Sequence, residues 1–522
     1  MHAPGSSRRF DIPGKVAEVP NHSRAKVAVR PTSLVHLPLD TLVQILSLVS
    51  PRDIISLRKC CKTLATASRA RIAWIHALRR ICGRHYAFLP GFPIEIMSTL
   101  EIEHAATSPE RLGSLLRKKL VSGSLQPLVT RVLQPRAPPN AAEIFNMPES
   151  EIDLGEFQDL ALISGGRYVI TCTMTGLVQL WDLGYNPNMV VNPFPLASMK
   201  MEENFVDMLT QPGPGSVIRL VLISRSPNAL RVQVYEVNLS AENPSFKEIN
   251  AFDIGVPAHV AISIDAFCLT RDRFSFHIYG RLCVWDFIED AWALWSTTLP
   301  ASQLHVVCDN VIQLSPDGIV IWGIPPLLPR VQGDEVIVEN HSPLLHLQCP
   351  LSRLRFPYPL MWQTGDFRTG EYPLHFDVTG VDEFGAFSFV RYHLRSLRTA
   401  NPEPDFPSFL PIRATQSTIA HSEFAAHGSV FRSGQLSDQD VLLLWRGPEG
   451  CVKGNISPWT DTRAAVVDSQ TGFLWRPPTP IQGNTAFDLC PTTGRLVVLM
   501  FKEIRVMDYL LPPAQNDHSA GD

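Results

Sequence analysis

The sequence predicts an α+β multidomain protein in which a small N-terminal all-α module precedes a larger all-β domain. Apolar residues recur with helical spacing between residues 34 and 120, and this period disappears after about residue 150. In the later part, a turn, a short strand and an aromatic residue recur together instead. The chain also contains 44 prolines, which suit many short strands joined by turns better than long helices.

Composition limits the class of protein. The 522 residues suffice for two or three domains, and 45% hydrophobic with 18% charged residues is a globular composition. No apolar run is long enough for a membrane span, and the first thirty residues contain no signal-peptide core. The ten cysteines are scattered without a C-x-x-C pair, which favours reduced thiols. We therefore expect a cytoplasmic and/or nuclear protein without membrane association.

Charge is distributed unevenly along the chain. Residues 1–140 carry 21 Lys and Arg against 8 Asp and Glu, whereas the remainder carries 25 against 42. This polarity indicates two modules with different partners. Several of the N-terminal charges fall on the outer faces of expected helices, so solvated surface is favoured over nucleic-acid binding.

The first part of the chain divides into an arm, a set of helices and a linker. Residues 1–33 are expected to be a disordered basic arm. A first helix is expected from about 38 to 49, and Ser50-Pro51 begins a second one with an N-cap and a proline at the first position. Ser108-Pro109 is expected to open a further helix that ends near Leu120. Residues 134–150 are expected to be a linker.

Seven strand units in the later part end in a large side chain. Their spacing averages about 54 residues, slightly longer than a typical four-stranded propeller blade. We expect the tryptophans among these anchors to be buried between neighbouring blades. The seven anchors are Trp181, Tyr235, Trp285, Trp322, Tyr392, Trp445 and Met507.

A motif within residues 34–75 consists, in order, of Leu37-Pro38, Leu42, Ile45-Leu46, Asp53, Leu57-Arg58, Cys61-Lys62 and Trp74. It resembles the F-box, a module that docks on the Skp adaptor of cullin–RING ubiquitin ligases. The resemblance assigns 34–82 to the F-box and leaves 83–133 as a helical linker region. It covers only a small part of the chain, but the order and spacing of its motif are specific. By this resemblance the adaptor-facing residues are Leu37, Pro38, Leu42, Ile45, Leu46, Leu57, Cys61 and Trp74.

The residues of the first helix support a binding role independently. Leu39, Val43 and Leu48 lie outside the apolar stripe of the helix, so it is apolar on more than one face. A segment this small cannot bury two apolar faces by itself. A partner surface would cover the second face, and packing on the chain's own C-terminal domain is the alternative.

Residues 155–510 resemble a divergent WD-repeat β-propeller, for which we expect seven blades within residues 151–511. The best segment runs from Ile163 through Gly176 to Trp181-Asp182. No Gly-His dipeptide occurs and Trp-Asp appears only twice, so the hydrogen-bonded Asp-His-Ser-Trp arrangement of the family cannot be assigned. Residues 512–522 are expected to be a disordered tail.

No catalytic signature is present in the sequence. The H-E-x-x-H, Walker A and G-x-S-x-G patterns are all missing, so we expect a non-catalytic protein with no cofactor and no metal site. The negative charge of the propeller region suggests instead a rim that attracts a basic or polar target segment, with plain solubility as the alternative. The candidate target-binding residues are Glu202, Glu203, Asp207, Glu289, Asp290, Asp382 and Glu383.

These resemblances imply the substrate-recognition subunit of an SCF-type ligase. In this role the F-box binds the Skp-type adaptor, and through it a cullin, while the propeller holds an unidentified protein substrate. An F-box scaffold without a degradative role is one alternative, and a propeller hydrolase with an incidental helical arm is another. The sequence does not contain the identity of the target.

Overall fold

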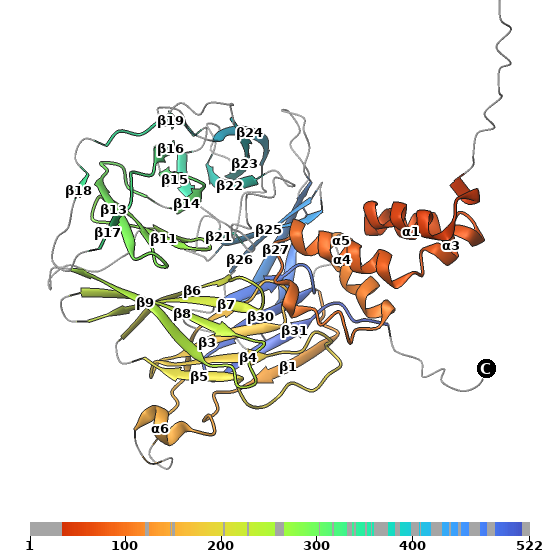
Figure 1. Ribbon diagram of the computed structural model, residues 1–522, viewed down its shortest axis with the longest axis horizontal. Helices are drawn as coiled ribbons and strands as arrows, with labels where there is room; N and C mark the ends of the chain where they lie inside the picture. The colour runs from red at the N-terminus through yellow and green to blue at the C-terminus, as the bar shows by residue number, and fades with distance from the viewer. Residues whose placement is uncertain are drawn as a thin grey trace, which may run out of the picture.

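The computed structural model shows a helical module followed by a ring of β-sheets (Figure 1). The structure describes residues 34–513, except 121–124, 147, 149–151, 202–203, 227–228, 256–265, 302, 316–317, 331–336, 339–340, 350–351, 356–357, 360–373, 382–386, 398–406, 408, 419–430, 438–439, 447–449, 459–469 and 478–485. The predicted basic arm and most of the predicted C-terminal tail lie outside the described residues.

Four helices form the first part of the helical module, and a long helix completes it. The second helix begins as predicted, because the Ser50 hydroxyl accepts a hydrogen bond from the Asp53 N–H at 3.2 Å and Pro51 takes the first helical position. The helical elements are η1 (Leu34–His36), α1 (Leu39–Leu48), α2 (Pro51–Arg58), α3 (Lys62–Ala67), α4 (Arg71–Arg84), η2 (Leu89–Gly91), α5 (Thr99–Leu120) and, further along the chain, α6 (Ala141–Phe145).

The long helix α5 begins well before Ser108, so the predicted start is wrong. Its actual start is a capping box. The Glu101 N–H donates to the Ser98 hydroxyl at 3.2 Å, and the Glu101 carboxylate accepts from the Ser98 N–H at 2.8 Å. Pro109 therefore lies inside the helix. The Ser-x-x-Glu spacing is present in the sequence, but Ser108-Pro109 imitates a helix start more closely.

The described strands form seven sheets. Sheet one contains β2 (Phe157–Leu162), β3 (Tyr168–Thr173), β4 (Leu177–Asp182) and β5 (Ala197–Lys200); sheet two contains β6 (Asn204–Pro212), β7 (Val217–Arg225), β8 (Ala229–Asn238) and β9 (Phe246–Gly255). Sheet three contains β10 (Ala266–Leu269), β11 (Arg273–Ile278), β12 (Arg281–Asp286), β13 (Ala291–Ser296), β17 (Leu328–Pro329) and β18 (Ile337–Val338); sheet four contains β14 (Gln303–Val307), β15 (Asn310–Ser315), β16 (Gly318–Gly323) and β19 (Leu345–Leu347).

The remaining strands belong to sheets five to seven. Sheet five contains β20 (Ser352–Arg355), β22 (Leu374–Val381), β23 (Phe387–Ser396) and β24 (Phe409–Thr418); sheet six contains β21 (Tyr358–Pro359), β25 (Phe431–Ser437), β26 (Asp440–Arg446), β27 (Val452–Pro458) and β28 (Gln470–Trp475); sheet seven contains β29 (Phe487–Cys490), β30 (Arg495–Met500), β31 (Glu503–Asp508) and β1 (Val129–Leu133).

Each of the seven predicted anchors lies in a different sheet. The four tryptophans among them are buried as predicted, with at most 4% of each side chain exposed. Trp285, for example, packs in a core cluster that joins sheets two and three. The repeat that the sequence shows is therefore the repeat of the sheets.

The sheets follow one another in chain order, and the last one packs against the first. Separate core clusters join sheet one to two, two to three, three to four, four to five, six to seven and seven to one. The ring is closed by β1, which pairs antiparallel with β31, so that the orange strand lies beside the blue ones in Figure 1. A ring of radially packed, mainly four-stranded sheets is a β-propeller.

The strand β1 also corrects the prediction of a helical linker over 83–133. The last five residues of that range, Val129–Leu133, form a strand of sheet seven.

Four sheets share an arginine–carboxylate pair. In each of these sheets, an arginine near the start of the second strand pairs with a carboxylate near the end of the third and so links the two strands. The Asp-His-Ser-Trp arrangement of WD repeats could not be assigned in the sequence, and this pair links the strands instead. The pairs are Arg167–Asp182 at 2.7 Å, Arg219–Glu236 at 2.9 Å, Arg273–Asp286 at 3.9 Å and Arg495–Asp508 at 2.7 Å.

Candidate functional site

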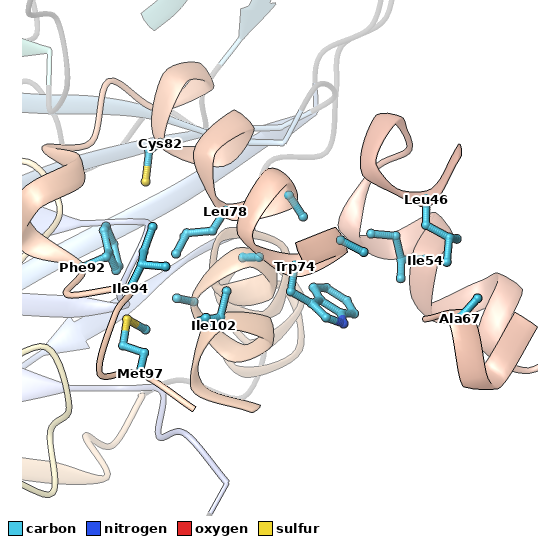
Figure 2. Packing of buried hydrophobic residues seen from close by; sticks show 14 of the residues in the cluster. Leu46, Ile54, Ala67, Trp74, Leu78, Cys82, Phe92, Ile94, Met97 and Ile102 are labelled. Atoms are coloured by element: carbon cyan, nitrogen blue, oxygen red, sulfur yellow. The ribbon is translucent and has the colours of Figure 1, made fainter. Parts of the chain in front are cut away.

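Helix α1 has apolar side chains on two faces. Leu42 and Leu46 are 1% exposed and belong to the same core cluster as Trp74 of α4 (Figure 2). Leu39 and Leu48, by contrast, are 52% and 80% exposed. They are the first and last residues of the helix and lie about 180° apart around its axis, so they are two separate exposed apolar side chains beside a packed core. We call the exposed and half-buried side chains of α1, from Leu39 at its start to Leu48 at its end, the free face.

The core behind the free face is fixed by polar contacts. The indole N–H of Trp74 donates to the Ser68 carbonyl at 2.7 Å, and the Arg58 guanidinium lies 5.4 Å from the centre of the indole ring. Arg58 also donates two hydrogen bonds to the Glu103 carboxylate, at 2.8 and 2.7 Å. These contacts tie α2 and α4 to α5, so the free face is held in one geometry.

The eight residues predicted to face the adaptor fall into two groups. Leu42, Leu46 and Trp74 lie in the module's own core, and their adaptor-facing role stays a prediction although their side chains are buried. Helical spacing shows that a stripe is apolar, but it does not show whether the same chain or another covers that stripe. For the other five the role also stays a prediction: Leu37, Ile45, Leu57 and Cys61 are half-buried, and Pro38 is exposed.

The opposite end of the helical module packs on the propeller. Leu112 and Leu116 of α5 are fully buried in a core cluster shared with sheets six and seven, while Ile102 of the same helix belongs to the core of the helical module. The Phe88 N–H donates to the Ser164 carbonyl of sheet one at 2.8 Å. One helix therefore belongs to two cores, and Figure 1 shows α4 and α5 between α1 and the sheets.

A polar joint accompanies this packing. The Asn186 side-chain amide of sheet one donates to the second oxygen of the Glu101 carboxylate at 3.0 Å. Burial, helped by the neighbouring Arg111, lowers the pKa of His104 to about 3. A small pocket here is lined from both parts of the chain, by Met97, Glu101 and His104 on one side and by Tyr185 and Thr493 on the other. We refer to these contacts as the docked end.

Three of the seven acidic residues predicted to bind a target lie within the described residues: Asp207, Glu289 and Asp290. Glu202, Glu203, Asp382 and Glu383 lie outside the described residues. Asp290 is engaged within its own sheet, because it accepts from the Trp285 indole N–H at 3.1 Å and pairs with Arg330 at 3.1 Å. Asp207 is half-buried and accepts from the N–H of the next residue at 2.7 Å, and Glu289 is exposed. Their target-binding role stays a prediction.

The described residues contain neither a cluster of metal-ligating side chains nor a membrane-spanning helix. No group of three or more His, Cys, Asp or Glu side chains in this part of the chain is placed to hold a metal ion. Nor is any helix that the structure describes long and apolar enough to cross a membrane.

Comparison with known families identifies residues 34–76 as an F-box domain. F-box domains bind Skp-type adaptors. A search of curated proteins gives no match. The chain thus carries an F-box domain followed by a β-propeller.

Several solved propellers are similar to this chain. They include the WD40 domain of SCAP from fission yeast (11% identity, TM-score 0.39, covering 70% of this chain and 86% of that one), the β-propeller domain of Cps50 (Swd1) from Myceliophteria thermophila (10%, 0.39, 68% and 98%) and the WD40 domain of coronin from Toxoplasma gondii (10%, 0.39, 69% and 86%). The ring of sheets described above, rather than these likenesses, carries the assignment of the fold.

Proposed function

We propose that this chain is the substrate-recognition subunit of an SCF-type cullin–RING ubiquitin ligase, acting in the cytoplasm, the nucleus or both. The F-box docks on the Skp-type adaptor, which links it to a cullin, and the propeller holds a protein target. The chain supplies no catalytic group. Its contribution is proximity, since holding the target beside the ubiquitin donor raises the effective concentration of the two reactants.

The observation that carries this proposal is the free face of α1, which lies within the segment matched by the F-box family. Leu39 and Leu48 are well exposed, although their neighbours on the same helix are in the core. Burial of each such side chain by a partner contributes roughly 1.5–3 kcal/mol. A free face of this kind is what an obligate adaptor partner would cover.

The docked end supports the second half of the proposal. A receptor must hold its target in a fixed position relative to the adaptor, because effective concentration falls when the connection is long and flexible. Here α5 belongs to both cores, and Glu101 and Phe88 add direct hydrogen bonds to sheet one.

Co-purification with recombinant Skp adaptor tests the docking step. The double variant Leu39→Asp with Leu48→Asp should lose the adaptor, whereas Leu37→Ala with Pro38→Ala should weaken it. Val190→Asp is the matched control, since Val190 is 94% exposed on the propeller and lies outside the F-box. If wild type does not co-purify, or if the double aspartate variant binds equally well, the docking proposal is wrong.

A separate measurement tests the degradative role. Once partners have been captured, deletion of the gene should raise the level of a true target and lengthen its half-life. Partner levels that stay unchanged, with adaptor binding intact, would identify a scaffold in place of a degradation receptor.

A further inference from the structure

The cysteines of the chain differ sharply in exposure. All ten lie within the described residues; six are buried, and Cys61, Cys308 and Cys349 are half-buried. Among these ten, Cys60 alone is exposed. A reagent dissolved in water must reach the sulfur before it can react, so exposure sets Cys60 apart from the other thiols.

Burial also suppresses the chemistry of the buried thiols. It raises the pKa of Cys172 to about 12 and the pKa of Cys268 to about 11, against an ordinary value of 9.0. Burial raises the pKa of Cys82 as well. Since the thiolate is the nucleophile in reactions of cysteine, these three sulfurs are protonated as well as shielded near neutral pH. The chain therefore presents one exposed thiol against a background of inert ones.

The exposed thiol lies in the short connection between α2 and α3. The Cys60 thiol donates to the Ser56 carbonyl at 3.4 Å, which lays its side chain along the last turn of α2. Leu57, in the same turn, and Cys61, the next residue, are both half-buried and are two of the residues predicted to face the adaptor. A group attached to Cys60 would therefore stand beside the predicted docking surface.

The charge around this connection is positive. Residues 54–70 contain four basic residues and no acidic one. Arg58 is paired with Glu103 of α5, whereas Lys59 and Lys62 are both exposed within two positions of Cys60. Exposed charges of one sign raise the local concentration of a small reagent of the opposite sign. This segment favours the approach of an anionic reagent.

The adjacent Cys61 is not placed to form a disulfide with Cys60. Consecutive Cα atoms lie about 3.8 Å apart across a trans peptide bond, whereas the Cα atoms of disulfide-linked cysteines are usually about 4.4–6.8 Å apart. The backbone at Cys61 is also extended, with φ of −160° and ψ of 165°, and successive side chains of an extended chain point to opposite sides. Oxidation of Cys60 therefore joins it to a sulfur from outside the chain.

We propose that Cys60 is a site of S-thiolation by a small anionic disulfide, glutathione disulfide, and that the attached tripeptide blocks docking of the adaptor. The Cys60 sulfur attacks one sulfur of the reagent, whose S–S bond breaks. A new S–S bond joins Cys60 to one glutathione, and the other leaves as a thiol that takes up the proton lost by Cys60. The block, though not the modification itself, rests on the proposed function.

Peptide mass mapping of the full-length protein after treatment with glutathione disulfide tests the site. Thiolation should appear at Cys60 about tenfold faster, or more, than at any other cysteine, because the others are half-buried or buried. Cys60→Ser should abolish this fast modification. Cys308→Ser is the matched control, since it removes a half-buried thiol of the propeller and should leave thiolation of Cys60 unchanged.

Binding to recombinant Skp adaptor tests the consequence. The thiolated wild type should bind the adaptor about tenfold more weakly, or less tightly still, than the reduced protein. Reduction should restore binding, which excludes misfolding as the cause of its loss. Cys60→Ser should bind the adaptor equally well before and after treatment. Adaptor bound beforehand should also slow thiolation of Cys60, because it covers that part of the surface.

Thiolation that spares Cys60, or that spreads evenly over the cysteines, would overturn the assignment of the site. Equal adaptor binding by the thiolated and the reduced protein would overturn the block. If the reduced wild type fails to bind the adaptor, the proposed function is wrong, while mass mapping still decides whether Cys60 is the site. The two failures are therefore distinguishable.

Discussion

The two ends of the helical module differ in what covers their apolar side chains. At the docked end, Leu112 and Leu116 are fully buried against sheets six and seven. At the free face, Leu39 and Leu48 are 52% and 80% exposed. Both pairs belong to amphipathic helices, so helix formation does not explain the difference. The docked end is a contact within one molecule, whereas the free face is the surface for which we propose a partner protein.

The largest expected effect tests whether the closing strand β1 belongs to the folding unit of the propeller, in two fragments that both lack α5. A fragment that starts at residue 151 lacks both α5 and β1, whereas one that starts at residue 125 keeps the closing strand β1. We expect the shorter fragment to aggregate without a cooperative melting transition, because the edge of β31 and the core beneath β1 are uncovered. Size-exclusion chromatography and thermal circular dichroism measure this. Equal stability of the two fragments would show that β1 is dispensable.

The next largest effect on stability concerns the ion pairs of Asp508, which join β1 to the last sheet of the propeller. Asp508 is fully buried and bonds both Arg495 and Arg131 of β1, each at 2.7 Å. Asp508→Asn leaves two buried guanidinium groups poorly compensated and should cost about 3–5 kcal/mol in the free energy of unfolding. Asp182→Asn is the matched control. Its pair with Arg167 is partly exposed, so that change should cost about 1 kcal/mol or less. Urea denaturation that gives equal losses would contradict this ranking.

A smaller effect is the response of the docked end to acid. The pKa of His104 is about 3 in the folded chain, against an ordinary value of 6.5. Between these values the unfolded chain binds more protons, so the free energy of unfolding falls as the pH drops below 7. We expect a loss of about 1–2 kcal/mol from this residue between pH 7 and pH 5. His104→Asn should flatten the stability profile over that range, and an unchanged slope would assign the acid response elsewhere.

The smallest effect separates a cap from an ordinary surface serine. Ser98→Ala removes the hydroxyl that caps α5 and should cost about 1 kcal/mol. Ser47 is the control, because its hydroxyl only donates to the Gln44 carbonyl on α1, and Ser47→Ala should change stability by less than about 0.5 kcal/mol. Thermal melting of the two variants side by side gives the comparison. Similar shifts would mean that the capping box contributes little to the docked end.

Signals local in the sequence predicted the structure well. The cap at Ser50 and the seven anchors, one in each sheet, all depend on residues within a few positions of one another. The predicted start of α5 at Ser108 is wrong because the residues at Ser98 and at Ser108 both have the pattern of a helix start, and the helix begins after Ser98. The structure decides between them, because the turn that follows Ser98 packs Ile102 into the core of the module.

Features that depend on distant partners were not predictable. The strand β1 has only five residues, and it is a strand because it pairs with β31 at the other end of the chain. In α1, the spacing separates Leu42, in the apolar stripe, from Leu48, outside it, but only the placement of α4 shows that the chain itself covers the stripe. The arginine–carboxylate pairs escaped notice for the same reason, because the two members come from different strands.

The pairing of β1 with β31 also determines when the propeller can complete its last sheet during protein synthesis. Val129 pairs with Asp508, 379 positions further along. At a synthesis rate of about 5–20 residues per second, β1 waits roughly 20–80 s for its partner to emerge from the ribosome. During that interval Leu133, which is buried in the finished ring, has nothing from sheet seven to cover it. The F-box helices before it can fold from local contacts within this time, so a nascent chain can present its adaptor surface before its propeller exists.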